Sequence, residues 1–287
     1  NLSLTRPAWI EIDLAKIFRD GLYADFSAFW LLIHASRFGP DAAAPSDSAL
    51  ERWREQGQQD GVAARDMLRH GVEAALVMLG QGAIEHPANT ALREALADGT
   101  LTAQGLYEEL LGIVYRLIFL FAAEDRDLLH PPGTTANRRA AYGDGYGVGR
   151  LRERAMRRAS WDRHHDAWDG LRAVFQALRT GAPTLGLPAL GGLFEPGRTP
   201  HLDEVRIGNR FVMEAIFRLA WLRPQGQPLA RVNWRDMETE ELGSVYEGLL
   251  ELIPDASAET RRFSFRDTDG AVGSERKSTG SYYTPDA

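Results

Sequence analysis

The stretch Leu106-Tyr-Glu-Glu-Leu-Leu-Gly-Ile-Val-Tyr-Arg-Leu-Ile-Phe-Leu-Phe121 decides the fold class of this 287-residue chain. It lies within the most apolar helix that the sequence predicts, Leu101–Leu129, where apolar residues recur at helical spacing. Extra apolar residues at Ile113 and Leu120 leave this helix little polar face. Such a helix is usually central to a bundle, and we expect Pro131-Pro132 to end it.

Helical periodicity also covers most of the remaining chain. We therefore predict a mainly α fold, a multi-helix domain with loop insertions, over residues 1–253. The second predicted helix is expected to break near Gly57 or Gly61, and the Gly-rich segments Gly133–Val148 and Gly181–Thr199 are expected to be loops. The predicted helices beside the central one are Asp13–Phe38, Ala49–Leu79, Gly149–Leu178, Asn209–Leu222 and Thr239–Leu252.

The pattern changes after Pro254. Arg262-Phe-Ser-Phe-Arg266 alternates between polar and apolar residues, which favours a short strand. Asp267–Ser274 is polar and contains glycine, which is typical of a linker. We therefore predict a linker with a short β segment over 254–274 and the start of a further domain over 275–287.

Composition sets limits on function. Hydrophobic residues make up 44% of the chain, which is enough for a sizeable core. The absence of cysteine excludes disulfides, thiolate zinc sites and cysteine nucleophiles, and it fits a cytoplasmic location. The net charge of −7 gives no global basic footprint for nucleic acid. The apolar run Leu117–Ala123 is far shorter than a membrane span, so we expect no membrane partner.

Four arginines form a local basic pattern in this acidic chain. Arg150, Arg154, Arg157 and Arg158 stand at i, i+4, i+7 and i+8, on one face of the predicted helix. Arginine suits bidentate contact with phosphate, so this face is a candidate for binding the DNA backbone. The alternative is a solvated helix face whose charges pair with nearby acidic residues.

Three further motifs favour structural roles over chemistry. The glycines of Gly143–Gly149 lack the preceding strand that a phosphate-binding loop needs. The adjacent histidines of Asp162–Asp166 would point about 100° apart on a helix, which favours a solvated face over a metal site. Glu124-Asp125-Arg126 ends the apolar helix, where acids oppose the helix dipole, so we expect a buried acid–arginine cluster that holds neighbouring helices.

A metal-dependent nuclease is a less favoured alternative. Asp255, Glu275 and Lys277 follow the order of acidic residues and lysine in such a core. That chemistry requires the three side chains on adjoining strands around a divalent ion. A polar linker separates them here, and we assign no metal ligand and no catalytic residue.

The segment Lys277-Ser-Thr-Gly-Ser-Tyr-Tyr-Thr-Pro285 resembles the Thr-Gly-Ser-Tyr-Tyr-Thr-Pro segment that begins the methyltransferase domain of large adenine-N6 DNA methyltransferases. That family includes type IIG restriction–modification enzymes and the methylases of BREX- and DISARM-like phage-defence systems. Two further segments are similar to the same family, Val114–Arg126 and Leu242–Glu251, the latter after Val232–Asp236.

The resemblance implies a cofactor and a parent reaction. In the family, the Tyr-Thr-Pro segment packs against the S-adenosylmethionine pocket, which implies Tyr282, Tyr283, Thr284 and Pro285 as residues on the cofactor side. The parent reaction would be base flipping and methyl transfer to adenine N6. The glycine-containing cofactor loop and the Asn-Pro-Pro-Tyr motif of the family are absent from these 287 residues, so we expect this chain alone to be inactive.

The resemblance therefore implies a non-catalytic helical N-terminal module that ends where an α/β methyltransferase domain would begin. Such a module would support the catalytic domain of a restriction–modification or phage-defence enzyme and contact the backbone of double-stranded DNA. The alternative is a scaffold that binds defence-system proteins and makes no direct contact with DNA.

Overall fold

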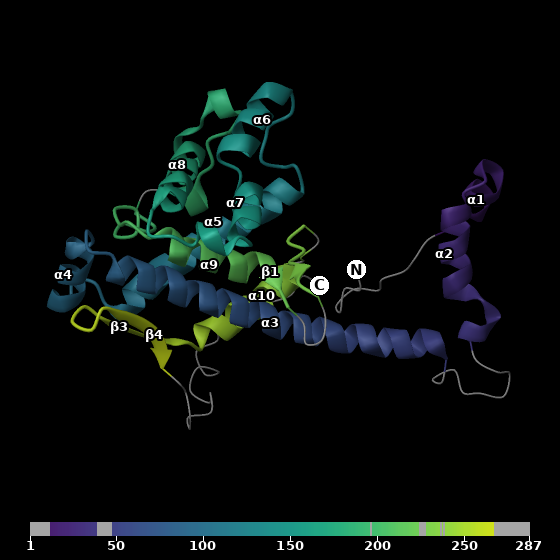
Figure 1. Ribbon diagram of the computed structural model, residues 1–287, viewed down its shortest axis with the longest axis horizontal. Coiled ribbons are helices and arrows are strands. Elements are labelled where there is room, and N and C mark those ends of the chain that lie inside the picture. The colour runs from purple at the N-terminus through teal and green to yellow at the C-terminus, as the bar shows by residue number, and fades with distance from the viewer. Residues whose placement is uncertain are drawn as a thin grey trace. The chain divides into compact units, whose positions relative to one another are not determined.

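The computed structural model describes residues 12–38, 48–195, 197–223, 228–235, 237 and 239–266, except for the side chains of 56–65, 239–242, 244 and 245. Figure 1 shows a mainly helical chain with a few short antiparallel strands, and the predicted fold class is confirmed. The chain divides into two compact units, Asn1–Asp66 and Met67–Ala287. The long helix α3 (Ala49–Glu85) runs through the boundary between them.

The first unit contains two short helices in place of the single helix predicted over Asp13–Phe38. Helix α1 (Leu14–Asp20) begins after Asp13, whose carboxylate accepts a hydrogen bond from Lys16 N at 2.8 Å. It ends at Gly21, which has a left-handed φ of 63°. That conformation is easy for glycine and cannot continue a helix. Helix α2 (Tyr23–Ile33) and the 3-10 turn η1 (Ala35–Arg37) follow.

The break expected in the next helix near Gly57 or Gly61 is absent, because α3 is continuous. Glycine weakens a helix by about 1 kcal/mol per residue but keeps its backbone N–H, so the hydrogen-bond ladder survives. Further along, Gly71 and Gly82 allow close packing: a β-carbon at Gly71 would lie 2.6 Å from the Arg218 carbonyl oxygen. The position of α3 in the second unit therefore depends on its small residues.

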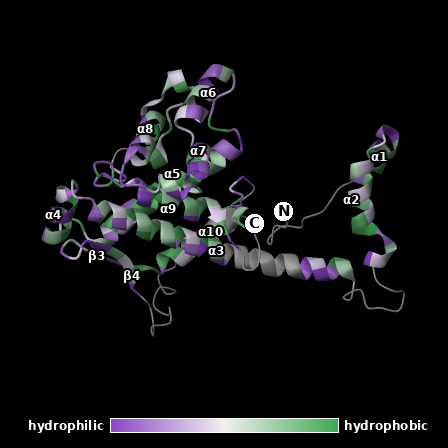
Figure 2. Cartoon of the chain, viewed as in Figure 1, coloured by the Kyte–Doolittle hydropathy of each residue, from purple (hydrophilic) through white to green (hydrophobic). Residues whose placement is uncertain are grey.

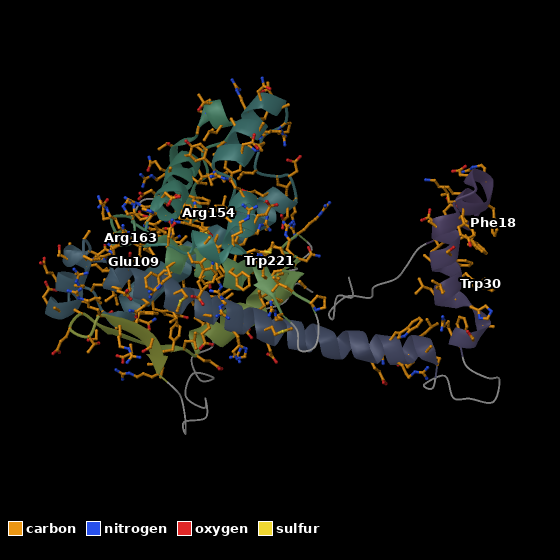
Figure 3. The ribbon with its side chains drawn as sticks, in the orientation of Figure 1. Phe18, Trp30, Glu109, Arg154, Arg163 and Trp221 are labelled. Carbon is orange, nitrogen blue, oxygen red and sulfur yellow. The ribbon has the colours of Figure 1, made fainter. Side chains whose placement is uncertain are left out.

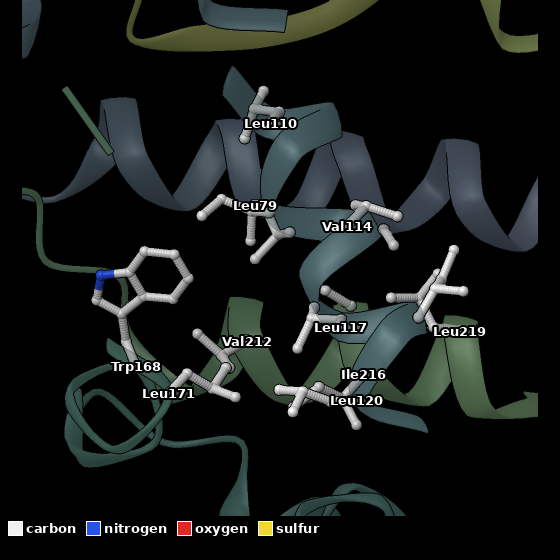
Figure 4. Packing of buried hydrophobic residues seen from close by; sticks show 14 of the residues in the cluster. Leu79, Leu110, Val114, Leu117, Leu120, Trp168, Leu171, Val212, Ile216 and Leu219 are labelled. Atoms are coloured by element: carbon white, nitrogen blue, oxygen red, sulfur yellow. The ribbon is translucent and has the colours of Figure 1, made fainter. Parts of the chain in front are cut away.

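Helix α5 (Ala103–Asp125) is central to the second unit, as its sequence predicts. It ends at Asp125, six residues before Pro131, so proline is not what stops it. The close-up in Figure 4 shows leucines of α5 packed between α3 on one side and α8 (Asp166–Thr180) and α9 (Asn209–Ala220) on the other. The labelled side chains of this cluster are Leu79, Leu110, Val114, Leu117, Leu120, Trp168, Leu171, Val212, Ile216 and Leu219.

Two predictions between α5 and α9 are wrong. The expected loop Gly133–Val148 contains the helix α6 (Ala136–Gly145), which tolerates glycines in its last turn. The expected helix Gly149–Leu178 is interrupted, giving α7 (Val148–Ala155), the 3-10 turn η3 (Arg158–Ser160) and α8. The 3-10 turns η4 (Pro183–Leu185) and η5 (Gly192–Phe194) lie within the predicted loop 181–199. Helix α4 (Thr90–Asp98) lies between α3 and α5 in the sequence.

Two antiparallel hairpins complete the second unit. β1 (Trp221–Leu222) pairs with β2 (Ala230–Arg231), and helix α10 (Thr239–Leu250) follows. The predicted strand Arg262–Arg266 is confirmed as β4. Its partner is β3 (Ile253–Ser257), within the segment predicted as linker. Phe263 of β4 is 3% exposed and packs where Gly80 of α3 leaves space, so the hairpin is part of the packed unit.

Candidate functional site

The predicted arginine face is not a single helical face. Helix α7 carries Arg150 and Arg154 but ends at Ala155, whereas Arg157 and Arg158 lie at and within η3. The helix ends because later side chains satisfy its last carbonyl groups. Ser160 Oγ donates to Arg154 O at 2.7 Å, and Trp161 Nε1 donates to Ala155 O at 2.9 Å. The i, i+7 and i+8 relations therefore do not describe the positions of these side chains.

The four arginines differ in the contacts that their side chains make. Arg154, labelled in Figure 3, pairs with Asp166 at 2.7 Å. Arg150 donates to the Gly145 carbonyl at 2.6 Å, and the Arg158 guanidinium stacks 3.8 Å from the centre of the Trp161 ring. Arg157 is exposed, and within the described residues its side chain makes no hydrogen bond or ion pair.

The acidic partner of Arg154 has a second role at the start of α8. Hydrogen bonds from Arg154 and then from Asn209 lower the pKa of Asp166 to about 2. Asn209 is fully buried, and its Oδ1 accepts from Ala167 N at 3.1 Å. Its Nδ2 donates to Asp162 at 2.9 Å and to Asp166 at 2.7 Å. One side chain at the start of α9 thus caps the start of α8.

The segment Asp162–Asp166 is a connection between η3 and α8, not the helix face predicted from its sequence. Asp162 Oδ1 accepts from the backbone N of His164 at 2.9 Å, and His165 pairs with Asp169 at 2.6 Å. Among the described residues, no group of three histidines, cysteines or acids could hold a metal ion.

The predicted acid–arginine cluster at the end of α5 is confirmed. Glu124 accepts hydrogen bonds from Tyr142 Oη and Val148 N, both at 2.7 Å, and from Gly149 N at 2.8 Å. The carboxylate therefore binds the N-terminus of α7, where free N–H groups and the helix dipole favour an anion. The Gly143–Gly149 glycines thus lead to a helix N-terminus that already holds the chain's own carboxylate.

Asp125 and Arg126 bind α7 a second time and join two more segments to α5, namely β2 and the chain at 235–237. Asp125 accepts two hydrogen bonds from Arg152, at 3.0 and 2.7 Å, and a third from Arg231 at 2.5 Å. Arg152 is 3% exposed and its guanidinium lies 4.9 Å from the Phe121 ring. Arg126 donates to the carbonyls of Arg235 and Met237 at 2.6 and 3.2 Å.

A second buried network, absent from the sequence-based expectations, lies earlier on α5. Glu109 is 6% exposed and accepts from the backbone N of His201 and Leu202, both at 3.0 Å, and its other oxygen lies 2.6 Å from His201 Nδ1. Arg116, 2% exposed, donates to Leu193 O at 3.0 Å and pairs with Asp203 at 3.3 Å. The sequence signal was a charged pair seven residues apart in an otherwise apolar helix.

The cofactor-side residues proposed from the resemblance cannot be placed. The residues Glu275, Lys277, Tyr282, Tyr283, Thr284 and Pro285 lie outside the described part of the chain. Of the three residues named for the nuclease alternative, only Asp255 lies in the part of the chain that the structure describes. It stands on β3 and forms an exposed pair with Arg266 of β4 at 3.2 Å.

Comparison with known proteins assigns no family. No protein-family model, curated protein or solved structure matches this chain. Of the helices in the described ranges, none has the length and apolar character that a membrane crossing requires.

We predict that Asp125→Ala destabilises the protein by about 3 to 5 kcal/mol, because the buried Arg152 guanidinium loses its counter-charge. Urea unfolding followed by circular dichroism measures this loss. The matched control is Asp144→Ala, which removes an exposed acid on α6 and should change the unfolding free energy by less than about 0.5 kcal/mol. Equal effects of the two substitutions would contradict a bracing role for Asp125.

We also predict that the Asp166 carboxyl titrates with a midpoint at about 2. Because this pKa is below the ordinary value of 3.8, the stability it contributes is present above that value and is lost as the pH falls through about 2. NMR titration of labelled aspartate measures the midpoint. Arg154→Gln should raise it and Arg150→Gln should leave it unchanged. A wild-type midpoint at the ordinary value would show that the Arg154–Asp166 pair does not form in solution.

Proposed function

We propose that this chain is the non-catalytic helical N-terminal module of an S-adenosylmethionine-dependent DNA adenine-N6 methyltransferase from a restriction–modification or phage-defence system. The segment Lys277–Pro285 carries this proposal, through its resemblance to the start of such methyltransferase domains. In the parent enzyme, Tyr282, Tyr283, Thr284 and Pro285 would border the cofactor pocket. The module would brace the catalytic domain and contact the DNA backbone.

The use of buried charge supports a bracing role. The carboxylates of Glu109, Glu124 and Asp125 each hold backbone N–H groups or a guanidinium of another segment. Acids and bases engaged in this way keep helices in fixed positions, because separating them would expose a buried charge without its partner. A rigid unit of this kind suits a domain that positions a larger catalytic domain.

The contact with DNA is assigned to three of the four predicted arginines. Arg150, Arg157 and Arg158 are exposed, whereas Arg154 is occupied by Asp166. Guanidinium groups on the surface of α7 and η3 can contact phosphates without reading bases. The DNA contact proposed here is therefore independent of sequence.

We expect the triple substitution of Arg150, Arg157 and Arg158 by glutamine to weaken duplex binding and to lower the salt slope by about 2.7, since each phosphate contact contributes about 0.9. Fluorescence anisotropy across a salt series measures both quantities. The control replaces the exposed Arg19, Arg54 and Arg262, which changes the net charge equally at other places. Equal effects of the two triple variants, or none, would remove the DNA contact from the proposal.

The parent enzyme is tested by reading the encoding gene past the codon for Ala287. We expect a methyltransferase core there, with an Asn-Pro-Pro-Tyr-like motif within about one domain's length, because that motif holds the flipped adenine. A following sequence without such a motif would overturn the assignment to this family. It would leave the bracing role of the buried charges untouched.

One observation favours the alternative of a protein-binding scaffold. Helix α2 is almost wholly apolar, as the hydropathy colours of Figure 2 show, yet none of its residues is buried. On α1 and α2, Phe18, Tyr23 and Trp30 are 69%, 80% and 52% exposed. Exposed aromatic clusters are typical of protein interfaces. Salt-insensitive binding of a partner protein, with no binding of duplex, would favour the scaffold over the DNA-contacting module.

A further inference from the structure

A pocket of about 440 Å³ lies where α5, α8, η5 and the turn at 201–204 come together. This volume is within the usual range for small-molecule sites. Most of its lining side chains are charged, which points to a charged ligand. Those that carry the argument are Arg116, Asp169, Arg172, Gln176, Arg179 and Asp203.

One face of α8 supplies most of the polar lining. Asp169, Arg172, Gln176 and Arg179 stand at i, i+3, i+7 and i+10, a spacing that keeps side chains on the same side of a helix. The opposite face of α8 is buried through residues such as Leu171. The helix is held by its apolar face, and its polar face borders the pocket.

Two acids of the pocket, Asp203 and Asp169, are already engaged, whereas two of its arginines pair with no acid among the described residues. Asp203 accepts from Arg116 at 3.3 Å and from Thr199 Oγ1 at 2.8 Å. Asp169 pairs with His165 on its own helix. Arg179 donates only to the neutral Gln176, and Arg172 has no hydrogen bond or ion pair within the described ranges.

Glu204 also lines the pocket but is exposed to solvent, where water screens its charge. The buried part of the lining is dominated by Arg116, which is 2% exposed and lies 5.3 Å from the Phe175 ring. Burial lowers the pKa of Arg116, and the cation of Arg179 lowers it further, although Asp203 acts in the opposite direction. Arg116 and Arg179 line the same pocket, where a bound anion would favour the charged form of both guanidinium groups.

We propose that this pocket binds the phosphate group of a small molecule through Arg172 and Arg179, above the buried Arg116. Guanidinium groups match phosphate oxygens in a bidentate geometry, and a phosphate group has the charge and the three acceptor oxygens to bind two arginines at once. A small ligand is favoured because a pocket of about 440 Å³ is of the size that encloses a small molecule. This site is separate from the arginines assigned to DNA.

The test is isothermal titration calorimetry, in which the 287-residue protein is titrated with inorganic phosphate and with adenosine monophosphate at constant ionic strength. We expect saturable binding of at least one of them, weakened about tenfold by Arg172→Gln and by Arg179→Gln, because each loses a charge-assisted hydrogen bond. Arg262→Gln is the matched control, since it removes an exposed arginine outside the pocket, on β4. It should leave the affinity unchanged.

Two results would overturn the proposal. One is that neither probe binds saturably at concentrations up to about 10 mM, which would be a weak affinity for a site with three arginines. The other is binding that both pocket variants retain at full strength. A third experiment titrates the protein with a blunt DNA duplex that carries no terminal phosphates. If the duplex binds and this binding is lost in the Arg172 and Arg179 variants, the pocket is a nucleic-acid site and the small ligand is rejected. Failure in any arm leaves the Arg150, Arg157 and Arg158 test unaffected.

Discussion

The need to neutralise charge inside an apolar core determines how the second unit is assembled. Helix α5 is buried on nearly all sides, yet it ends in Glu124-Asp125-Arg126. Glu124 and Asp125 are half-buried, where a charge needs partners, and the exposed Arg126 forms its bonds beside them. The partners of the three residues are the N-terminus of α7, Arg152 and Arg231, and the carbonyls at 235 and 237. Three segments distant in sequence are thereby fixed to one helix end.

The same constraint acts along the length of α5. Glu109 and Arg116 lie one heptad apart and hold the chain between 193 and 203, which has little regular structure of its own. Apolar packing gives the unit its core, but it does not specify where an irregular loop should lie. The buried charges supply that information, because only one arrangement satisfies all of them at once. The pocket beside Arg116 is a consequence of this placement.

Periodicity in the sequence was enough to predict α5, α9 and the mainly helical class, because apolar spacing records burial directly. Periodicity did not predict the end of α7, because no proline or glycine stands there. The last carbonyl groups of this helix accept hydrogen bonds from the side chains of Ser160 and Trp161. The dipole argument correctly predicted partners for Glu124 and Asp125, but not that these would be Val148 N or Arg152, since such pairs depend on tertiary folding. Asn209 shows the same limit, because its side chain caps α8, an earlier helix of the chain, and not the helix in which it stands.

The carboxylate of Glu124 at the start of α7 amounts to a ligand that is covalently tethered to its receptor. Two N–H groups, from Val148 and Gly149, hold it at 2.7 and 2.8 Å. A tethered group competes with free anions at an effective concentration on the order of millimolar or higher. A mobile anion can therefore occupy this helix end only after the joint between α5 and α7 has opened. The N-terminus of α7, which would be a general anion site, therefore serves as a joint between α5 and α7.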